Sequence, residues 1–122
     1  LFLNVLPLAI YDRYLKRSPA YLQAATIDYI ESDSVVRISG SMNYVNLMPL
    51  KQQFADILAQ NGGNLVLDCS QLDYIDSAFI ASLLLFQRYL NEEKRQLTLC
   101  NVPKRIKRLL RLNSVLVRFR LI

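Results

Sequence analysis

Five short segments of the chain have the apolar pattern of β-strands. They are residues 25–31, 35–39, 65–67, 97–100 and 115–122. The first two flank a polar turn at residues 32–34, which predicts a β-hairpin. The third has no polar alternation, as is typical of a strand covered on both faces, and the fourth is another short strand. In the last segment, alternation places Val115, Val117 and Phe119 on one side of a strand.

Three longer segments have apolar residues at the 3.6-residue spacing of an α-helix. Asn46 can cap the first of these helices, Pro49 fits its first turn, and the glycines at 62–63 end it. The second helix opens at residues 76–77. Its first half is apolar almost all round, so we expect it to be central and well buried. The third helix begins at residues 102–103.

The order of the predicted elements is β β α β α β α β. Strands separated by single helices pair in parallel through right-handed crossovers, and the opening hairpin adds an antiparallel edge. The pattern therefore predicts an α/β fold, with a mixed sheet of about five strands and helices packed against it. We expect this domain to span residues 24–122. Residues 1–23 are expected to be a helical extension or the remnant of an upstream domain.

Composition narrows the chemistry that this domain can perform. The chain has 122 residues and no histidine, which excludes Ser-His catalysis and every histidine-ligated metal site. Its two cysteines, Cys69 and Cys100, are too few for a four-cysteine zinc site. We expect both to be reduced core thiols, which suits a cytoplasmic protein. No apolar stretch approaches the roughly 18 residues of a membrane span.

Charge is distributed unevenly along the chain. The first 87 residues carry a net charge of −3 and the rest carry +8, for a total of +5. Four cations of the last predicted helix lie opposite its apolar residues: Lys104, Lys107, Arg108 and Arg111. This face is either simply solvated, or it contacts an acidic protein or an anionic membrane surface. Nucleic acid is not expected as a partner, because no aromatic residue is interleaved to stack on bases.

The densest polar cluster surrounds the start of the second predicted helix. It contains Asp68, Asp73 and Asp76 together with Ser70 and Ser77. Three carboxylates at the carboxyl end of a strand could hold Mg²⁺, but Asp and Ser are also the preferred capping and turn residues. We favour the second interpretation and assign no catalytic residue, metal or cofactor. With three glycines in the chain there is no glycine-rich phosphate loop, and no nucleophile lies beside a base.

Three motifs occur in a fixed order along the chain. Residues 36–43 read V-R-I-S-G-S-M-N, an apolar strand ends at Asp68 before a helix that opens with Asp-Ser at 76–77, and residues 97–103 read L-T-L-C-N-V-P. Together they resemble the core of STAS domains, the family of anti-anti-sigma factors and of the cytoplasmic tails of sulfate transporters. The resemblance covers residues 24–122. It implies a non-enzymatic, cytoplasmic protein-interaction domain similar to a bacterial anti-sigma-factor antagonist that regulates transcription.

The resemblance also implies where a protein partner docks, on a loop formed by Asn43, Asp76, Ser77, Ala78 and Phe79. Family members that are switched by phosphorylation have the sequence Asp-Ser-Ser-Gly here, and the second serine accepts the phosphate. In this chain Ala78 stands at that position, Phe79 replaces the glycine, and Asn43 replaces an aspartate. Asp76 and Ser77 match the positions that shape and cap the helix start. The resemblance therefore implies the fold and the interaction role, without the serine switch.

Two alternatives remain open at this point. Residues 13–22 resemble the tail of WecG/TagA-type glycosyltransferases, which implies an accessory domain at the end of a glycosyltransferase or a transporter. A nucleotide-binding STAS module is the other alternative, although the chain has no phosphate loop. Residues 1–23 are rich in tyrosine and large apolar residues, so a homodimer formed through this segment is also open.

Overall fold

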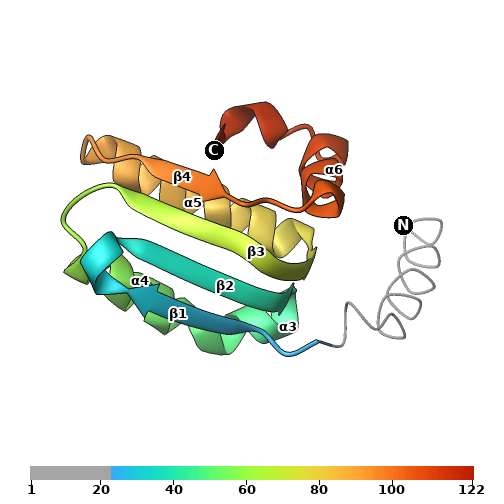
Figure 1. Ribbon diagram of the computed structural model, residues 1–122, viewed down its shortest axis with the longest axis horizontal. Helices are drawn as coiled ribbons and strands as arrows, with labels where there is room; N and C mark the ends of the chain where they lie inside the picture. The colour runs from blue at the N-terminus through green and yellow to red at the C-terminus, as the bar shows by residue number, and fades with distance from the viewer. Residues whose placement is uncertain (1–22) are drawn as a thin grey trace, which may run out of the picture.

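One five-stranded mixed sheet forms the centre of the computed structural model, which describes residues 23–122 (Figure 1). The strand order is β1-β2-β3-β4-β5. β1 pairs with β2 in antiparallel fashion and all later pairs are parallel, so the predicted mixed α/β sheet is confirmed. The strands are β1 (Thr26–Ile30), β2 (Val35–Met42), β3 (Leu65–Ile75), β4 (Leu97–Cys100) and β5 (Arg120–Leu121). The predicted extension and its dimer contact lie outside the described residues, apart from Gln23.

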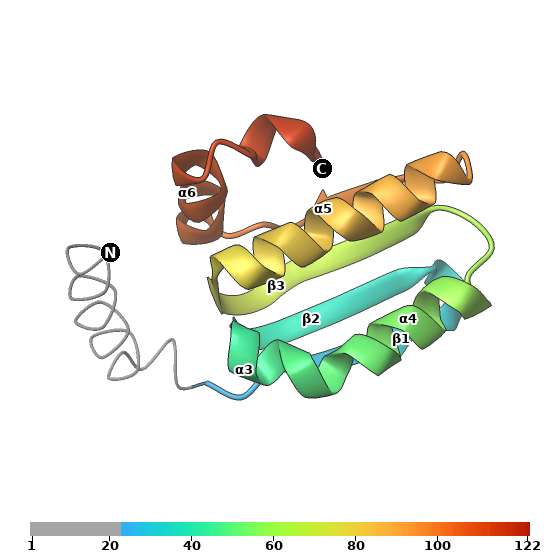
Figure 2. The same cartoon turned by 180° about the vertical axis from the view of Figure 1, so that it is seen from behind.

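Two helices, α4 and α5, cover one face of this sheet (Figure 2). The α-helices are α3 (Tyr44–Leu47), α4 (Lys51–Gln60), α5 (Ser77–Glu92) and α6 (Lys104–Leu112). Short 3₁₀ helices are η1 (Glu31–Asp33), η2 (Met48–Leu50) and η3 (Leu116–Arg118). α6 lies beyond the carboxyl ends of β3 and β4. Within residues 23–122, no helix has the length and apolar character needed to cross a bilayer.

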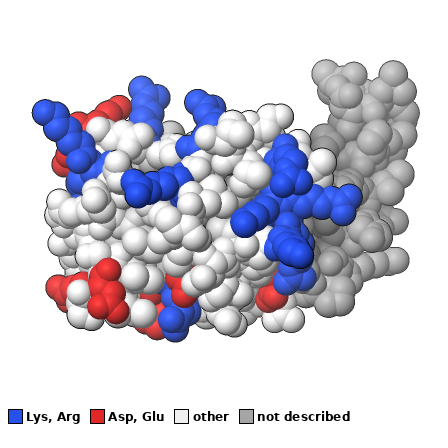
Figure 3. Space-filling model, turned by 45° about the horizontal axis from the view of Figure 1, so that its top comes forward, with Lys and Arg blue, Asp and Glu red and all other residues white. Residues whose placement is uncertain are grey.

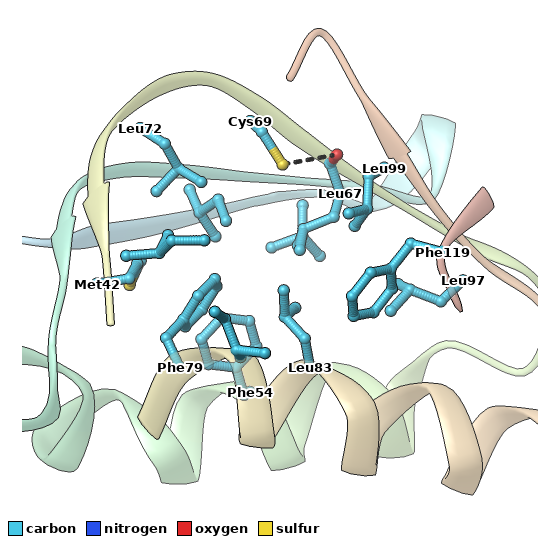
Figure 4. Close-up of a cluster of buried hydrophobic side chains, with 14 of the residues drawn as sticks. Met42, Phe54, Leu67, Cys69, Leu72, Phe79, Leu83, Leu97, Leu99 and Phe119 are labelled. Carbon is cyan, nitrogen blue, oxygen red and sulfur yellow. Dashed lines mark hydrogen bonds between the residues drawn. The ribbon is translucent and has the colours of Figure 1, made fainter. Parts of the chain in front are cut away.

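The hydrophobic core lies between the sheet and these two helices (Figure 4). Alternate residues of each strand point inward, as the pleat requires, and on β2 these include Val36 and Ile38, both fully buried. Phe79 of α5 is also fully buried, and the Phe54 and Phe86 rings pack with centroids 5.1 Å apart. The expected all-round burial of α5 is wrong on one side. The sheet covers only one side of α5, so the opposite side meets solvent, and Ala81 and Leu85 are exposed.

The first predicted helix is broken into α3, η2 and α4, and its cap is not the residue expected. Asn43 caps α3 by accepting a hydrogen bond from the Asn46 backbone N–H (2.8 Å). Asn46 lies inside α3, where its side-chain amide donates to the Ser41 carbonyl (2.9 Å). Pro49 lies in the first turn of η2, after α3, and therefore not in the first turn of the helical segment as expected; proline is tolerated at the start of η2 because a first-turn N–H has no partner within the helix.

β3 is much longer than its apolar run predicts. The run covers residues 65–67, but the strand continues to Ile75, so Asp68 and Asp73 lie within a strand and not in a loop. Residues 68–75 of β3 pair with β2, and Met42 of β2 lies opposite Ile75. Two register shifts interrupt this pairing. This pairing is a property of two distant segments, so an apolar pattern along one segment could not reveal it.

The predicted C-terminal strand is mostly wrong. Residues 116–118 form η3, and β5 contains only two residues. Val115 and Phe119 are buried, but Val117 is 93% exposed, so the three residues do not share one side as predicted. The helical turn sends the Val117 side chain outward, which an alternating strand would not do.

Gly40 lies at a tight crossing between β2 and the segment that enters β1. Its φ of +80° belongs to the left-handed region that favours glycine, and the β2–β3 register shifts at this point. A Cβ atom on Gly40 would lie 1.6 Å from the Ala24 carbonyl oxygen. The crossing therefore needs a residue without a side chain.

Arg95, buried in the loop before β4, holds the end of α4. Its guanidinium donates to the backbone carbonyls of Leu58 (3.3 Å), Asn61 and Gly63 (2.8 Å). It also pairs with the Glu93 carboxylate at 2.9 Å. α4 ends before the glycines at 62–63, as predicted. The last carbonyls of a helix have no N–H partner within the helix, and here the Arg95 side chain donates hydrogen bonds to carbonyls at the end of α4.

Candidate functional site

The carboxyl ends of β2 and β3 place two helix starts side by side. Met42 and Ile75 are register partners at these ends, and the Asp76 backbone N–H donates to the Met42 carbonyl (3.3 Å). Two residues after each strand ends, a helix begins: α3 follows β2 and α5 follows β3. We call residues 43–48 and 76–79 together the helix-start site.

Asp76 joins the two helices through a single carboxylate. Its Oδ1 accepts a hydrogen bond from the Phe79 backbone N–H of α5 (2.9 Å), which is the N-cap contact. Its Oδ2 accepts from the Tyr44 backbone N–H of α3 (2.7 Å). Both donors belong to the first turn of a helix, where the unpaired N–H groups favour a negative charge. The prediction that the second helix opens at residues 76–77 is therefore confirmed, with Asp76 as its cap.

Asn43 fixes the other side of the helix-start site. It is buried, and its side-chain amide donates to the Ser41 hydroxyl (3.0 Å) while its oxygen caps α3. Asn46 adds a bond to the Gln23 carbonyl (2.9 Å), which ties the entry to β1 to the same place. The backbone around the site is thus held by the buried side chain of Asn43 and by the partly buried side chains of Asn46 and Asp76.

The structure separates the five predicted loop residues by exposure. Ser77 is exposed, and Asp76 and Ala78 are half-buried. Asn43 and Phe79 are buried, so they position the loop and offer no side chain to a partner. The structure brings all five together at the starts of α3 and α5, and their role in docking a partner stays a prediction.

Sequence reasoning missed the apolar surface of this site. Tyr44, Val45 and Met48 are 58%, 63% and 46% exposed, on and just after a helix of four residues. The sequence does contain a signal for this surface. Tyr44 and Val45 are large apolar residues that directly follow Asn43, and they lie outside the 3.6-residue spacing of the buried side of the helix. Together with Ser77, these three side chains form the exposed part of the helix-start site.

The acidic cluster does not converge on one point. Asp68 pairs with Arg37 (3.2 Å), Asp73 pairs with Arg105 (2.9 Å), and Asp76 serves the two helix starts. Within the described part of the chain, no group of three acidic or cysteine side chains is arranged to hold a metal ion. The magnesium alternative has no geometric basis here.

Asp68 is held ionised by its neighbours. Burial acts to raise its pKa, but hydrogen bonds from Ser70, Arg37 and Asn101 outweigh burial and keep the pKa below its usual value. Asp68 therefore contributes stability at neutral pH, and this contribution is lost as the pH falls through that lowered pKa.

Both cysteines are free thiols in the structure, and Cys69 is buried while Cys100 is half-buried. Burial, with smaller contributions from Cys100 and Asp68, raises the pKa of Cys69 to about 12. Burial and then Asp68 raise the pKa of Cys100. Neither thiol has the lowered pKa of a reactive cysteine.

The four predicted basic residues lie together on α6. Lys104, Lys107, Arg108 and Arg111 are exposed and, with Leu112, line a shallow hollow of about 420 Å³. Ile106 and Leu110 on the other side of the helix are buried in the core. The predicted two-faced character of this helix is confirmed.

Known proteins are similar to this chain over most of its length. A family model described as "Mlab, STAS domain" matches residues 26–115. The "Putative anti-sigma factor antagonist BtrV" of Bordetella bronchiseptica is 27% identical over 91 residues, which are 75% of this chain and 78% of that protein.

Two solved structures have a similar fold. One is a "putative anti-sigma factor antagonist" from Thermotoga maritima, with a TM-score of 0.64 and 16% identity over 80% of this chain and 84% of that chain. The other is the Bacillus cell fate determinant SpoIIAA in its phosphorylated form, with a TM-score of 0.58 and 14% identity over 81% of this chain and 91% of that chain. The mixed sheet, the helices on one of its faces and the family match agree, and the chain belongs to the STAS domain family.

Proposed function

We propose that this chain is a cytoplasmic, non-enzymatic domain that acts as an anti-sigma factor antagonist, and that its protein partner docks on the helix-start site. The observation that carries the proposal is the exposure of Tyr44, Val45 and Met48 beside the shared Asp76 carboxylate. Aromatic residues and methionine are enriched in protein interfaces, where they fill pockets of the partner.

The helix-start site is also preorganised for binding. Asn43 and Asp76 fix the first turns of α3 and α5, so the exposed side chains project from a backbone that is already ordered. Binding to such a surface loses less conformational entropy than binding to a loop that must first become ordered. This rigidity suits a site that recognises one partner surface.

A photo-crosslinking amino acid placed at position 45 tests where the partner docks. In cells of the native host, we expect the crosslinked protein to be an anti-sigma factor, identified by mass spectrometry. The same probe in place of Asp28, which is exposed on β1, is the control and should give no such crosslink. A crosslink from position 45 to a glycosyltransferase or a transporter would instead support the accessory-domain alternative.

Affinity for the purified partner then tests the side chains. Val45→Ser combined with Met48→Ser should weaken binding at least about tenfold, because interface hot spots contribute this much or more. Leu85→Ser is a matched control, since Leu85 is an equally exposed apolar residue on α5, away from the site. Calorimetry that gives equal affinities for the double variant and the control would contradict the proposed docking site.

The same proposal includes the absence of the phosphorylation switch. Ala78 has no hydroxyl, and Ser77, although exposed, directly follows the Asp76 carboxylate that holds both helices. A phosphate on Ser77 would bring close to two negative charges beside that carboxylate. We therefore expect no efficient phosphate transfer from an anti-sigma kinase and ATP, measured by mass spectrometry of the intact chain.

The positive control for this assay is a STAS protein with an intact Asp-Ser-Ser-Gly motif. Ala78→Ser alone is not expected to restore the switch, because Phe79, which replaces the glycine, is locked in the core. Stoichiometric phosphate on Ser77 of the unmodified chain would show that the switch has moved by one residue.

A further inference from the structure

α6 presents a cluster of cations that the rest of the described protein does not neutralise. We call Lys104, Lys107, Arg108, Arg111 and Leu112 the α6 basic face, which lines the hollow of about 420 Å³. Among residues 23–122, none of its four cations has an acidic partner. Arg105 on the same helix does have one, in Asp73. No carboxylate of residues 23–122 therefore competes with an external anion for these four side chains.

The distribution of charge over the surface favours an extended anionic partner. Figure 3 shows Lys and Arg side chains gathered over the α6 end of the described molecule and along its upper edge. The acidic side chains visible in this view lie mainly at the opposite end. A one-sided charge distribution orients a protein toward a charged surface.

Exposed aliphatic side chains accompany these cations. Leu112, at the end of α6, is 70% exposed, and Val117 on η3, which packs against α6, is 93% exposed. Neither side chain can donate or accept a hydrogen bond. Such residues gain little from the backbone phosphates of a nucleic acid or from the carboxylates of an acidic protein, but they can insert between lipid headgroups.

We propose that the α6 basic face binds the surface of a bilayer that contains anionic lipids, with Leu112 entering the headgroup region. Each lysine or arginine near such a surface strengthens binding about fivefold. The attraction falls off within a Debye length, so high salt weakens it steeply. This contact is separate from the helix-start site, and it places a partner-binding domain at a membrane surface.

Sedimentation with lipid vesicles tests the proposal on the full chain. Vesicles of phosphatidylcholine with roughly 30% phosphatidylserine should bind the protein at about 0.1 M salt, and much less at about 0.5 M. Lys107→Gln with Arg108→Gln should weaken this binding about 25-fold, at fivefold for each charge. Leu112→Ser, at an exposed position, should weaken it by a smaller factor without changing its dependence on salt.

The matched control is Lys51→Gln with Lys94→Gln, which removes the same charge from exposed positions outside α6. We expect this control to bind vesicles within about twofold of the unmodified chain, because its charges lie away from the face. The apolar residues 1–10 are present in every variant, so they cannot produce a difference between them. Circular dichroism confirms that each variant is folded.

Three results would overturn the proposal. The first is no binding to phosphatidylserine vesicles at low salt. The second is equal vesicle binding by the α6 variant and the matched control, which would show that binding depends only on the net charge of the protein. The third is an α6 variant that loses affinity for polyglutamate or for duplex DNA while vesicle binding is unchanged, which would assign the face to an acidic protein or to nucleic acid.

Discussion

Replacing Gly40 with alanine is expected to destabilise the domain by about 4 kcal/mol or more, a large part of the stability of a typical domain. The new Cβ would lie 1.6 Å from the Ala24 carbonyl oxygen, and neither of the two backbone segments can yield as a flexible side chain would. The φ of +80° adds strain for any residue with a Cβ. Urea denaturation followed by circular dichroism measures the loss.

Gly62→Ala is the matched control for this prediction. A Cβ on Gly62 would meet no atom within 4 Å, and Gly62 does not have a positive φ. Its free energy of unfolding should change by less than about 1 kcal/mol, and in the stabilising direction, because alanine restricts the unfolded chain. If Gly40→Ala unfolds at the same urea concentration as Gly62→Ala, the tight crossing at Ala24 does not exist.

Replacing Arg95 with methionine should cost about 3 kcal/mol of stability. Methionine fills similar space, but it leaves the carbonyls at the end of α4 without the guanidinium donor. Each buried carbonyl without a partner costs about 1–3 kcal/mol, and Leu58 and Asn61 are both buried residues. Thermal and urea unfolding should both reveal the loss.

Two further variants separate the contributions of Arg95. Arg95→Lys keeps the charge but cannot reach three carbonyls from one ammonium group, so we expect an intermediate loss. Glu93→Gln removes only the ion pair, whose carboxylate is about half exposed, and should cost less than about 1 kcal/mol. A loss in Glu93→Gln equal to that in Arg95→Met would show that the ion pair, and not the carbonyl contacts, supplies the stabilisation.

Features that depend on neighbouring residues were predictable from the sequence. Asp76 caps α5 through the backbone N–H of Phe79, three residues along the chain, and such a cap leaves a clear local pattern. The β1–β2 hairpin was equally accessible, because its polar turn directly joins two β-type runs. The parallel order of the remaining strands followed from the single helices between them.

Contacts between distant segments left no such pattern. The second hydrogen bond of Asp76, to Tyr44, spans 32 residues, and the bond of Arg95 to Gly63 spans the same number. The length of β3 depends on its partner β2 in the same way, so the apolar run at residues 65–67 could not predict that the strand continues past Asp73. Apolar residues such as Val45 were not recognised as surface, because periodicity marks a core stripe and not the exceptions to it.

The shared carboxylate of Asp76 makes the first turns of α3 and α5 open as one unit. The amides of Tyr44 and Phe79 have the same acceptor group, so a fluctuation that withdraws the Asp76 side chain releases both hydrogens to solvent together. A partner that rests only on α3 would therefore slow the exchange of an amide in α5 that it never touches. Binding of a partner at α3 would thus affect α5 through the Asp76 side chain.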